Sequence, residues 1–337
     1  MKGGVPHLLY IGTEFTMMLN AKKEMVFDKN RPTPSCHAST VLPLPNGEIV
    51  VAWFGGTEER ADDVDIWLSI RSGEKWSEPQ RVTADEHMPH WNPVLFLRLD
   101  GTVCLFFKIG KKVRFWHSWL STSADNGRTW SKPEEVVPGD TGNGRGPVKN
   151  KCLHLSDGRV LAPASSEKDG RWLSFIDMSF DDGVTWQKQP DVPTRRPHRR
   201  YIPMIQPTLW ESAPGLVHML TRTNVGRVYR SDSADYGATW CMAYKTKLLN
   251  NNSGLDLAKT DNGDLFLVSN PVAENWGKRT PLTLMKSADN GETWEEVLVL
   301  EKDEGEYSYP AIVAQGNKLY ITYTWQRETI AFWVVEL

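Results

Sequence analysis

Residues 123–130 read SADNGRTW, and the five positions Ser-x-Asp-x-Gly-x-Thr-Trp recur at residues 179–186, 233–240 and 287–294. We call this eight-residue pattern the Asp box. A partial copy at residues 69–76 retains the serine, the glycine and the tryptophan. The five tryptophans lie 54 to 56 residues apart, a period typical of propellers and other repeat arrays.

The composition of the Asp box predicts a tight turn between two strands. In such turns an aspartate side chain accepts backbone N–H groups, and glycine adopts the left-handed backbone that other residues avoid. Serine and threonine hydroxyls tie the turn, and tryptophan is large enough to fill the core between neighbouring sheets. One carboxylate per turn is too few to hold Ca²⁺, so we expect a structural turn and no metal site.

Length and charge restrict the class of protein. The repeat extends along most of the 337 residues, which predicts a single domain over residues 1–337. A formal net charge of −3 argues against a nucleic-acid binder, and the chain has no apolar run long enough for a membrane helix. The N-terminal residues lack the pattern of a signal peptide, so we expect a cytoplasmic protein. Nothing indicates a cofactor, and the oligomeric state stays open.

Apolar runs alternate with turns between successive Asp boxes, which predicts an all-β chain of four-stranded antiparallel sheets. We expect the first strand of each sheet to begin near one of six positions: His37, Trp91, Asn150, Gln206, Gly254 and Tyr309. Six starts predict a six-bladed β-propeller with Asp-box turns.

The C-terminal residues 309–337 supply about three strands, while residues 7–15 and 24–27 offer unused strand material. A ring closed by N-terminal and C-terminal strands leaves no exposed sheet edge. We therefore expect the last blade to borrow an N-terminal strand. The basic residues 195–200 form either a solvated loop or an overhang above a site for an anionic ligand.

Propeller geometry places the start of each first strand and the loop between second and third strands at one end of the ring. The residues expected there from strand starts are His37, Asn92, Lys149, Asn150, Gln206, Asp256, Tyr307 and Tyr309. Those expected from loops are Asp62, Asp63, Lys108, Glu167, Arg222, Arg279 and Arg327. They either line a wet channel or converge in a binding site.

Five cations in that set favour an anionic ligand: Lys108, Lys149, Arg222, Arg279 and Arg327. Like charges held together repel one another unless an anion neutralises them, and guanidinium groups bind carboxylates particularly well. We therefore expect a ligand with a carboxylate, such as an acidic oligosaccharide or glycoside.

The Asp boxes, the six blades and these loops resemble the BNR-repeat sialidase-like superfamily over essentially the whole chain. Sialidases hold the sialic acid carboxylate with three arginines, protonate the leaving group with an aspartate and attack with a tyrosine that a glutamate activates. The resemblance implies that Arg222 and Arg279 are the second and third arginines. It implies that Tyr307, or its competitor Tyr309, is the nucleophile, and that Asp63, or its neighbour Asp62, is the acid.

Two positions depart from the family pattern. His37 stands where the first arginine is expected, and Gln206 stands where the glutamate that activates the tyrosine is expected. Glutamine cannot accept a proton from a phenol, so the help must come from the arginines or from a carboxylate such as Glu167. Alternatively, Glu167 is an ordinary solvated loop residue. His37 is either a hydrogen-bonded structural residue or a catalytic group, with an ordinary pKa of about 6.5.

Three functions follow. The first is a sialidase-like exo-acting glycosidase with Asp63 as acid, Tyr307 as nucleophile and Arg222 and Arg279 binding the carboxylate of a sialic, other keto-acid or uronic sugar. The second is a lyase in which His37 and a tyrosine act on a neutralised uronate. The third is a non-catalytic carbohydrate-binding propeller, with aromatic side chains stacking on sugars: Trp91, Trp116, Trp276 and Trp325.

Overall fold

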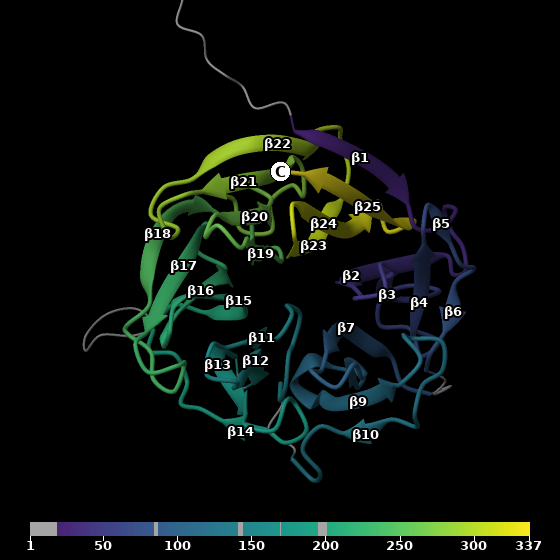
Figure 1. Ribbon diagram of the computed structural model, residues 1–337, viewed down its shortest axis with the longest axis horizontal. Coiled ribbons are helices and arrows are strands. Elements are labelled where there is room, and N and C mark those ends of the chain that lie inside the picture. The colour runs from purple at the N-terminus through teal and green to yellow at the C-terminus, as the bar shows by residue number, and fades with distance from the viewer. Residues whose placement is uncertain (1–18, 84–86, 141–143, 169, 195–200) are drawn as a thin grey trace, which may run out of the picture.

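Six antiparallel sheets surround a central axis in the computed structural model of the chain (Figure 1). The structure describes residues 19–83, 87–140, 144–168, 170–194 and 201–337. The expected six-bladed β-propeller is therefore confirmed. Residues 7–15, which we considered as strand material, and the basic residues 195–200 lie outside the described residues.

The first three blades follow one another in chain order. Blade one contains β2 (Ser35–Pro43), β3 (Ile49–Gly56), β4 (Asp65–Ser72) and two short strands that both pair with β4, β5 (Lys75–Trp76) and β6 (Gln80–Arg81). Blade two contains β7 (His90–Leu97), β8 (Val103–Ile109), β9 (His117–Ser123) and β10 (Glu134–Glu135), with a short 3₁₀ helix, η1 (Val113–Phe115), before β9. Blade three contains β11 (Leu153–His154), β12 (Val160–Lys168), β13 (Arg171–Ser179) and β14 (Gln187–Lys188).

The remaining blades complete the ring. Blade four contains β15 (Met204–Ala213), β16 (Leu216–Thr223), β17 (Arg227–Ser233) and β18 (Tyr244–Leu249). Blade five contains β19 (Asp256–Lys259), β20 (Leu265–Ser269), β21 (Leu282–Ser287) and β22 (Glu295–Glu301). Blade six contains β23 (Tyr307–Gln315), β24 (Lys318–Trp325), β25 (Thr329–Glu336) and β1 (Asn20–Met25). Each first strand begins within three residues of the position expected from sequence.

The N-terminal strand β1 closes the ring, as predicted. It pairs antiparallel with β25 from Asn20 opposite Glu336 to Met25 opposite Ala331, and so forms the outer edge of blade six (Figure 1). The first and last strands of the described chain thus belong to one sheet, which fixes blade six next to blade one.

The Asp boxes have one wiring in all four complete copies. The serine hydroxyl accepts the glycine N–H at 2.8 to 2.9 Å, and an aspartate oxygen accepts the threonine N–H at 2.8 to 2.9 Å. The threonine hydroxyl donates to the second aspartate oxygen at 2.5 to 2.6 Å. The glycines have φ between 82° and 87°, which explains why glycine recurs at that position.

A separate hydrophobic cluster fills each interface between neighbouring blades, because every sheet is covered on both faces. Strand β3, for example, is buried along its whole length, with one face toward blade two and the other toward blade six. The box tryptophans join these clusters at the interface with the preceding blade, as Trp186 does between blades two and three. The expectation that tryptophan fills the core between sheets is confirmed.

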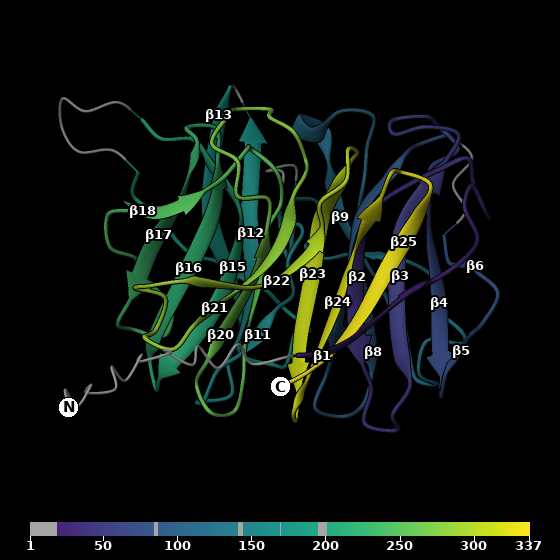
Figure 2. The same ribbon diagram turned by 90° about the horizontal axis from the view of Figure 1, so that it is seen from above.

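Strand register defines the two ends of the ring. In blade four, Met204 pairs with Thr223 at one end, while Glu211 and Ser233 both pair with Val217 at the other. We call the first the site end and the second, where the Asp boxes lie, the box end. The strands run between these two ends in the side view (Figure 2). None of the helical structure in the described residues has the length and apolar character to cross a membrane.

Replacing Asp235 with alanine is expected to lower the free energy of unfolding by about 1–2 kcal/mol, because the carboxylate accepts hydrogen bonds from Ser233 and Thr239. Although its partial burial would raise the pKa of Asp235, these bonds lower it overall. The stabilisation is therefore complete above the unfolded pKa of about 3.9 and is lost as the pH falls below it. Urea unfolding at several pH values measures both effects.

The matched control is Asp261→Ala, which removes an exposed carboxylate from the turn between β19 and β20, at the box end of blade five. It should leave the urea midpoint nearly unchanged. Equal losses in the two variants would contradict a special role for the box carboxylate.

Candidate functional site

Four first strands carry a β-bulge at the site end. The ladder shifts register in β2, β7, β15 and β23, and a bulge re-aims the side chains of its strand. Each bulge contains a residue with φ between 43° and 55°, a backbone that non-glycine residues rarely adopt: Ala38, Asn92, Gln206 and Tyr309. Proline follows three of these residues. Such strain persists only where the surroundings enforce it, and it gathers at functional sites.

Tyr309 lies at the centre of the polar groups at this end. Its hydroxyl accepts a hydrogen bond from Arg222 Nη1 at 2.8 Å, and its ring centroid lies 4.3 Å from that of His37. The guanidinium carbons of Arg222 and Arg279 lie 5.8 and 5.6 Å from the same ring. Blades one, four, five and six therefore each contribute a side chain to one site.

Neutral acceptors hold Arg222 in place. Its Nη1 also donates to Gln206 Oε1 at 3.1 Å, and its Nε donates to Asn252 Oδ1 at 2.8 Å. The rings of Trp172 and Trp276 lie 5.8 and 5.6 Å from its guanidinium carbon. Because amide and phenol oxygens carry no full charge, these contacts orient the guanidinium group without neutralising it.

A second group of charges adjoins Tyr309. Glu306 Oε1 accepts hydrogen bonds from Arg279 Nη1 and Arg327 Nε, both at 2.7 Å, and Arg327 also pairs with Glu59 at 2.6 Å. Burial would raise the pKa of Glu306, but the two arginines lower it overall. Glu306 is thus an internal carboxylate for two of the cations that we expected to bind a ligand.

His37 is buried against Tyr309 and is electrically neutral in the neutral pH range. Its Nδ1 lies 2.9 Å from Thr324 Oγ1, and only 3% of its surface is exposed. Burial lowers the pKa of His37 well below its usual value, and the positive charges of Arg327, Arg279, Arg222 and Lys149 lower it further. A neutral imidazole can accept a proton, but the lowered pKa makes His37 a weaker base than an ordinary histidine.

Lys149 is buried behind Tyr309. Its Nζ donates to Asn150 Oδ1 at 2.8 Å and to the carbonyl oxygens of Leu255 and Pro310. Burial lowers the pKa of Lys149 to about 7. The backbone of Gly254 passes between the lysine and the tyrosine, where an added Cβ would lie 3.1 Å from Lys149 Cε and 3.5 Å from Tyr309 Cδ2.

Tyr307, expected to be the nucleophile, does not lie among these groups. Its ring is buried in the cluster between blades five and six, and its hydroxyl accepts a hydrogen bond from Gln326 Nε2 at 3.0 Å. Burial raises the pKa of Tyr307. On a regular strand, Tyr307 and Tyr309 would face the same side, because side chains alternate with a period of two. The bulge at Tyr309 breaks this alternation, so only Tyr309 meets the arginines.

Lys108 also fails to join the other cations. It is buried, and its Nζ donates to Ser118 Oγ at 2.7 Å and to the Arg145 carbonyl at 2.6 Å. Burial lowers the pKa of Lys108 to about 7, although the nearby carboxylate of Asp177 opposes the shift. The expected convergence of five cations is therefore wrong for Lys108. The other four lie close enough to His37 for their positive charges to lower its pKa.

The expected acids occupy different places. Asp63 is exposed and caps its own loop by accepting the Thr57 N–H and hydroxyl, while Asp62 pairs with Lys111 at 3.0 Å. Glu167 lies near the end of β12 and not in a solvated loop. Burial raises its pKa against the opposing charge of Arg222, so its carboxyl is within electrostatic reach of the site.

The remaining expected residues have mainly structural contacts. Asn150 Nδ2 donates to the carbonyls of Gln206 and Pro207, and Asp256 pairs with Lys151 at 3.0 Å. Asn92 is buried at the bulge of blade two.

The four tryptophans considered for sugar stacking differ in exposure. Trp91 and Trp116 are buried between blades one and two, and Trp325 lies under Lys29. Trp276 is 64% exposed and lies beside Arg222. It is therefore the one of the four that presents a free ring surface next to the site.

Sequence reasoning missed Glu306, Asn252, Thr324, Trp172 and Glu59. All five join the site through contacts with residues far away in the sequence, and no spacing in the sequence indicates them. The bulges did leave a signal, because Asn-Pro, Gln-Pro and Tyr-Pro each interrupt an apolar first strand at residues 92, 206 and 309.

Comparison with known proteins agrees with the propeller fold. The sequence profile of the BNR repeat-like domain matches residues 47–321. A protein of unknown function from Dyadobacter fermentans superposes with a TM-score of 0.76 and 15% identity, over 94% of this chain and 99% of its own. The NanB sialidase of Streptococcus pneumoniae superposes with a TM-score of 0.71 and 12% identity, over 93% of this chain and 70% of its own.

A sialidase from Trypanosoma rangeli, in a complex with 2,3-difluorosialic acid described as a covalent intermediate, gives a TM-score of 0.74 and 16% identity. The match covers 94% of this chain and 59% of that one, so the present chain spans less than two thirds of that sialidase. At such low identities these similarities demonstrate a common fold.

Replacing Arg327 with glutamine is expected to raise the pKa of His37. Arg327 is the strongest of the four positive charges that lower this pKa, and its removal also leaves the Glu306 carboxylate less neutralised. An NMR titration of the imidazole protons measures the change. Arg128→Gln, which removes an arginine from the box end, is the matched control and should leave the titration of His37 unaltered. An identical titration in Arg327→Gln and the parent would contradict charge control of His37.

Proposed function

The chain belongs to the BNR repeat-like domain family, and on that premise we propose that it is an exo-acting, sialidase-like glycoside hydrolase that cleaves a terminal acidic sugar. The sugar is a sialic, another keto-acid or a uronic residue. The observation that carries the proposal is the 2.8 Å hydrogen bond from Arg222 to the hydroxyl of Tyr309, with Arg279 and His37 beside the same ring.

Recognition of the acidic sugar rests on Arg222. Its contacts with Gln206, Asn252 and Tyr309 orient the guanidinium group and leave it positively charged. A ligand carboxylate gains charge-assisted hydrogen bonds to such a group. Arg279 adds positive potential, although it shares its charge with Glu306.

The sugar ring has an aromatic neighbour in this proposal. Trp276 is exposed and lies 5.6 Å from the Arg222 guanidinium carbon, measured to its ring centroid. An indole face beside a carboxylate-binding group fits an acidic sugar, because the apolar face of the sugar stacks on the ring while its carboxylate meets the arginine.

Tyr309 replaces Tyr307 as the proposed nucleophile. A phenol ordinarily has a pKa of about 10, so it needs a base or a positive potential to attack. Arg222 donates directly to the phenol oxygen and would stabilise the phenolate. Because Gln206 is uncharged, it forms no ion pair that would neutralise this arginine. His37, whose ring lies 4.3 Å from that of Tyr309, is the proposed proton acceptor. Because its lowered pKa makes it a weak base, stabilisation of the phenolate by Arg222 carries most of the activation.

The proposed reaction has two steps. The Tyr309 oxygen attacks the anomeric carbon, the glycosidic bond breaks, and a carboxylic acid protonates the departing oxygen; water then releases the sugar from the tyrosine. Glu167 suits the acid because burial raises its pKa, and Asp63 is the alternative on its exposed loop. A sialidase with this fold has been captured as a covalent intermediate, which supports the covalent route.

A uronate-directed lyase is the second candidate, favoured by the contact between His37 and Tyr309. The neutral imidazole would remove the proton next to the uronate carboxyl group, whose charge the arginines neutralise, and the tyrosine would protonate the leaving oxygen. This elimination creates an unsaturated uronate that absorbs in the near ultraviolet. Products without that absorbance would remove the lyase, and saccharide binding without any product would favour a carbohydrate-binding propeller.

Replacing Tyr309 with phenylalanine is expected to lower turnover at least about 100-fold, because the nucleophile is lost and the Arg222 contact has no acceptor. The assay is a panel of sialosides and uronate-containing oligosaccharides, with the products measured by mass spectrometry and absorbance.

Tyr307→Phe is the matched control from the same strand, and it should retain turnover within a few-fold once circular dichroism confirms folding. Loss of turnover in Tyr307→Phe together with full turnover in Tyr309→Phe would overturn the assignment.

A further inference from the structure

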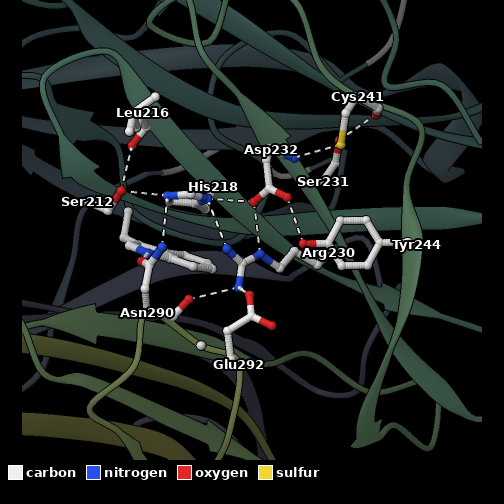
Figure 3. A network of polar contacts seen from close by, with 12 residues as sticks. Ser212, Leu216, His218, Arg230, Ser231, Asp232, Cys241, Tyr244, Asn290 and Glu292 are labelled. Atoms are coloured by element: carbon white, nitrogen blue, oxygen red, sulfur yellow. Dashed lines mark hydrogen bonds and ion pairs between the residues drawn. The ribbon is translucent and has the colours of Figure 1, made fainter.

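A second cluster of polar side chains lies at the box end, between blades four and five (Figure 3). Ser212 belongs to β15 within a bulge between Glu211 and Ala213, two residues before the turn to β16. The bulge re-aims its side chain, and Ser212 Oγ lies 2.7 Å from His218 Nε2. The hydroxyl group is therefore hydrogen-bonded to an imidazole nitrogen and lies near the molecular surface, since Ser212 is half-buried.

His218 is oriented on three sides. Its ring stacks on Trp210 with centroids 4.9 Å apart, its Nε2 meets Ser212, and its Nδ1 lies 2.5 Å from Asp232 Oδ1. With Nδ1–H donating a hydrogen bond to the carboxylate, Nε2 is the nitrogen whose lone pair faces the serine hydroxyl. A serine, a histidine and an aspartate linked in this order have the geometry of an activated nucleophile.

Asp232 is held as a carboxylate. Burial would raise its pKa, but hydrogen bonds from His218, Tyr244 and Arg230 lower it to about 2. Tyr244 donates to Oδ2 at 2.7 Å and Arg230 Nε donates to Oδ1 at 2.9 Å. Arg230 Nη2 also lies 3.1 Å from His218 Nδ1, the longer of the two contacts of that nitrogen. The ionised Asp232 therefore keeps the imidazole in place.

Asn290 supplies an amide group beside the imidazole that contacts Ser212. Its Oδ1 accepts the Trp210 indole N–H at 2.7 Å, which fixes the amide so that Nδ2 lies 3.3 Å from His218 Nε2 (Figure 3). Ser212 and Asn290 Nδ2 thus meet at the same ring nitrogen. An asparagine N–H next to a nucleophile can stabilise the oxyanion that forms during acyl transfer.

We propose that Ser212, His218 and Asn290 form a second catalytic site, which hydrolyses short-chain carboxylic esters, with Asp232 as its positioning residue. This site is independent of the glycosidase proposal, because it lies at the opposite end of the propeller. The exposed Leu216, whose carbonyl lies 3.4 Å from Ser212 Oγ, offers an apolar contact for a small acyl group.

The reaction begins when Ser212 Oγ adds to the ester carbonyl and its proton passes to His218 Nε2. The tetrahedral oxyanion accepts a hydrogen bond from Asn290 Nδ2, then collapses and expels the alcohol, which takes the proton from His218. Water, deprotonated by the same imidazole, attacks the acyl-serine. The carboxylic acid leaves, and the serine hydroxyl is restored.

The full-length chain is tested with p-nitrophenyl acetate and with a fluorophosphonate that labels activated serines. We expect the label on the peptide that contains Ser212, found by mass spectrometry, and a loss of hydrolysis of at least about 100-fold in Ser212→Ala. Ser156→Ala is the matched control, because that exposed hydroxyl bonds to the Glu211 carboxylate and, among the described residues, to no imidazole. It should retain both labelling and hydrolysis.

Asp232→Asn tests the positioning role. The amide cannot hold the same imidazole tautomer, so hydrolysis should fall at neutral pH and its pH profile should change, while Ser212→Ala loses activity at every pH. Absence of label on Ser212, or equal hydrolysis by Ser212→Ala and the parent, would overturn the proposal. Because both readouts concern Ser212 alone, they stand whether or not the central site cleaves acidic sugars.

Discussion

Pairing of β1 with β25 is the interaction on which the rest of the structure depends. It completes blade six from both ends of the described chain and covers the edge of β25. Blade six then packs on blade one, where Ala38 N–H and His37 Nδ1 both contact Thr324 Oγ1 and Ser39 contacts Thr322. These contacts join residues nearly 290 positions apart and bring His37 to Tyr309.

The central site combines excess positive charge with burial. Two features limit the positive charge of the site. Glu306 pairs with two of the arginines, and the four cations lower the pKa of His37, which disfavours a further positive charge on its imidazole. Lys149 responds in the same direction, since its burial lowers its pKa to about 7. Arg222 differs from Arg279 and Arg327, because amide and phenol oxygens orient its guanidinium group.

The two ends of the propeller use similar side chains differently. At the site end, bulges place Gln206 and Tyr309 in left-handed backbone near the axis. At the box end, the regular wiring of the Asp boxes is structural, yet the box turn of blade five also contributes Asn290 to the network around His218. A structural repeat can thus also supply a side chain to a separate polar network, because the side chain of Asn290 contacts Trp210 and His218 of the neighbouring blade.

The sequence by itself determined the box turns, the number of blades, the strand starts to within three residues and the closure of the ring. These features depend on local turn chemistry and on periodic burial, and the repeat shows the same local pattern several times along the chain. The sequence also identified Arg222, Arg279, Arg327, Lys149 and His37 as residues of one end. Only the tertiary structure placed Tyr309, and not Tyr307, beside Arg222, separated Lys108 from the other cations, and revealed Glu306 as a partner of two arginines. The reason is physical: a single bulge reverses which side chain faces the axis, and ion pairs between blades depend on packing that no local pattern encodes.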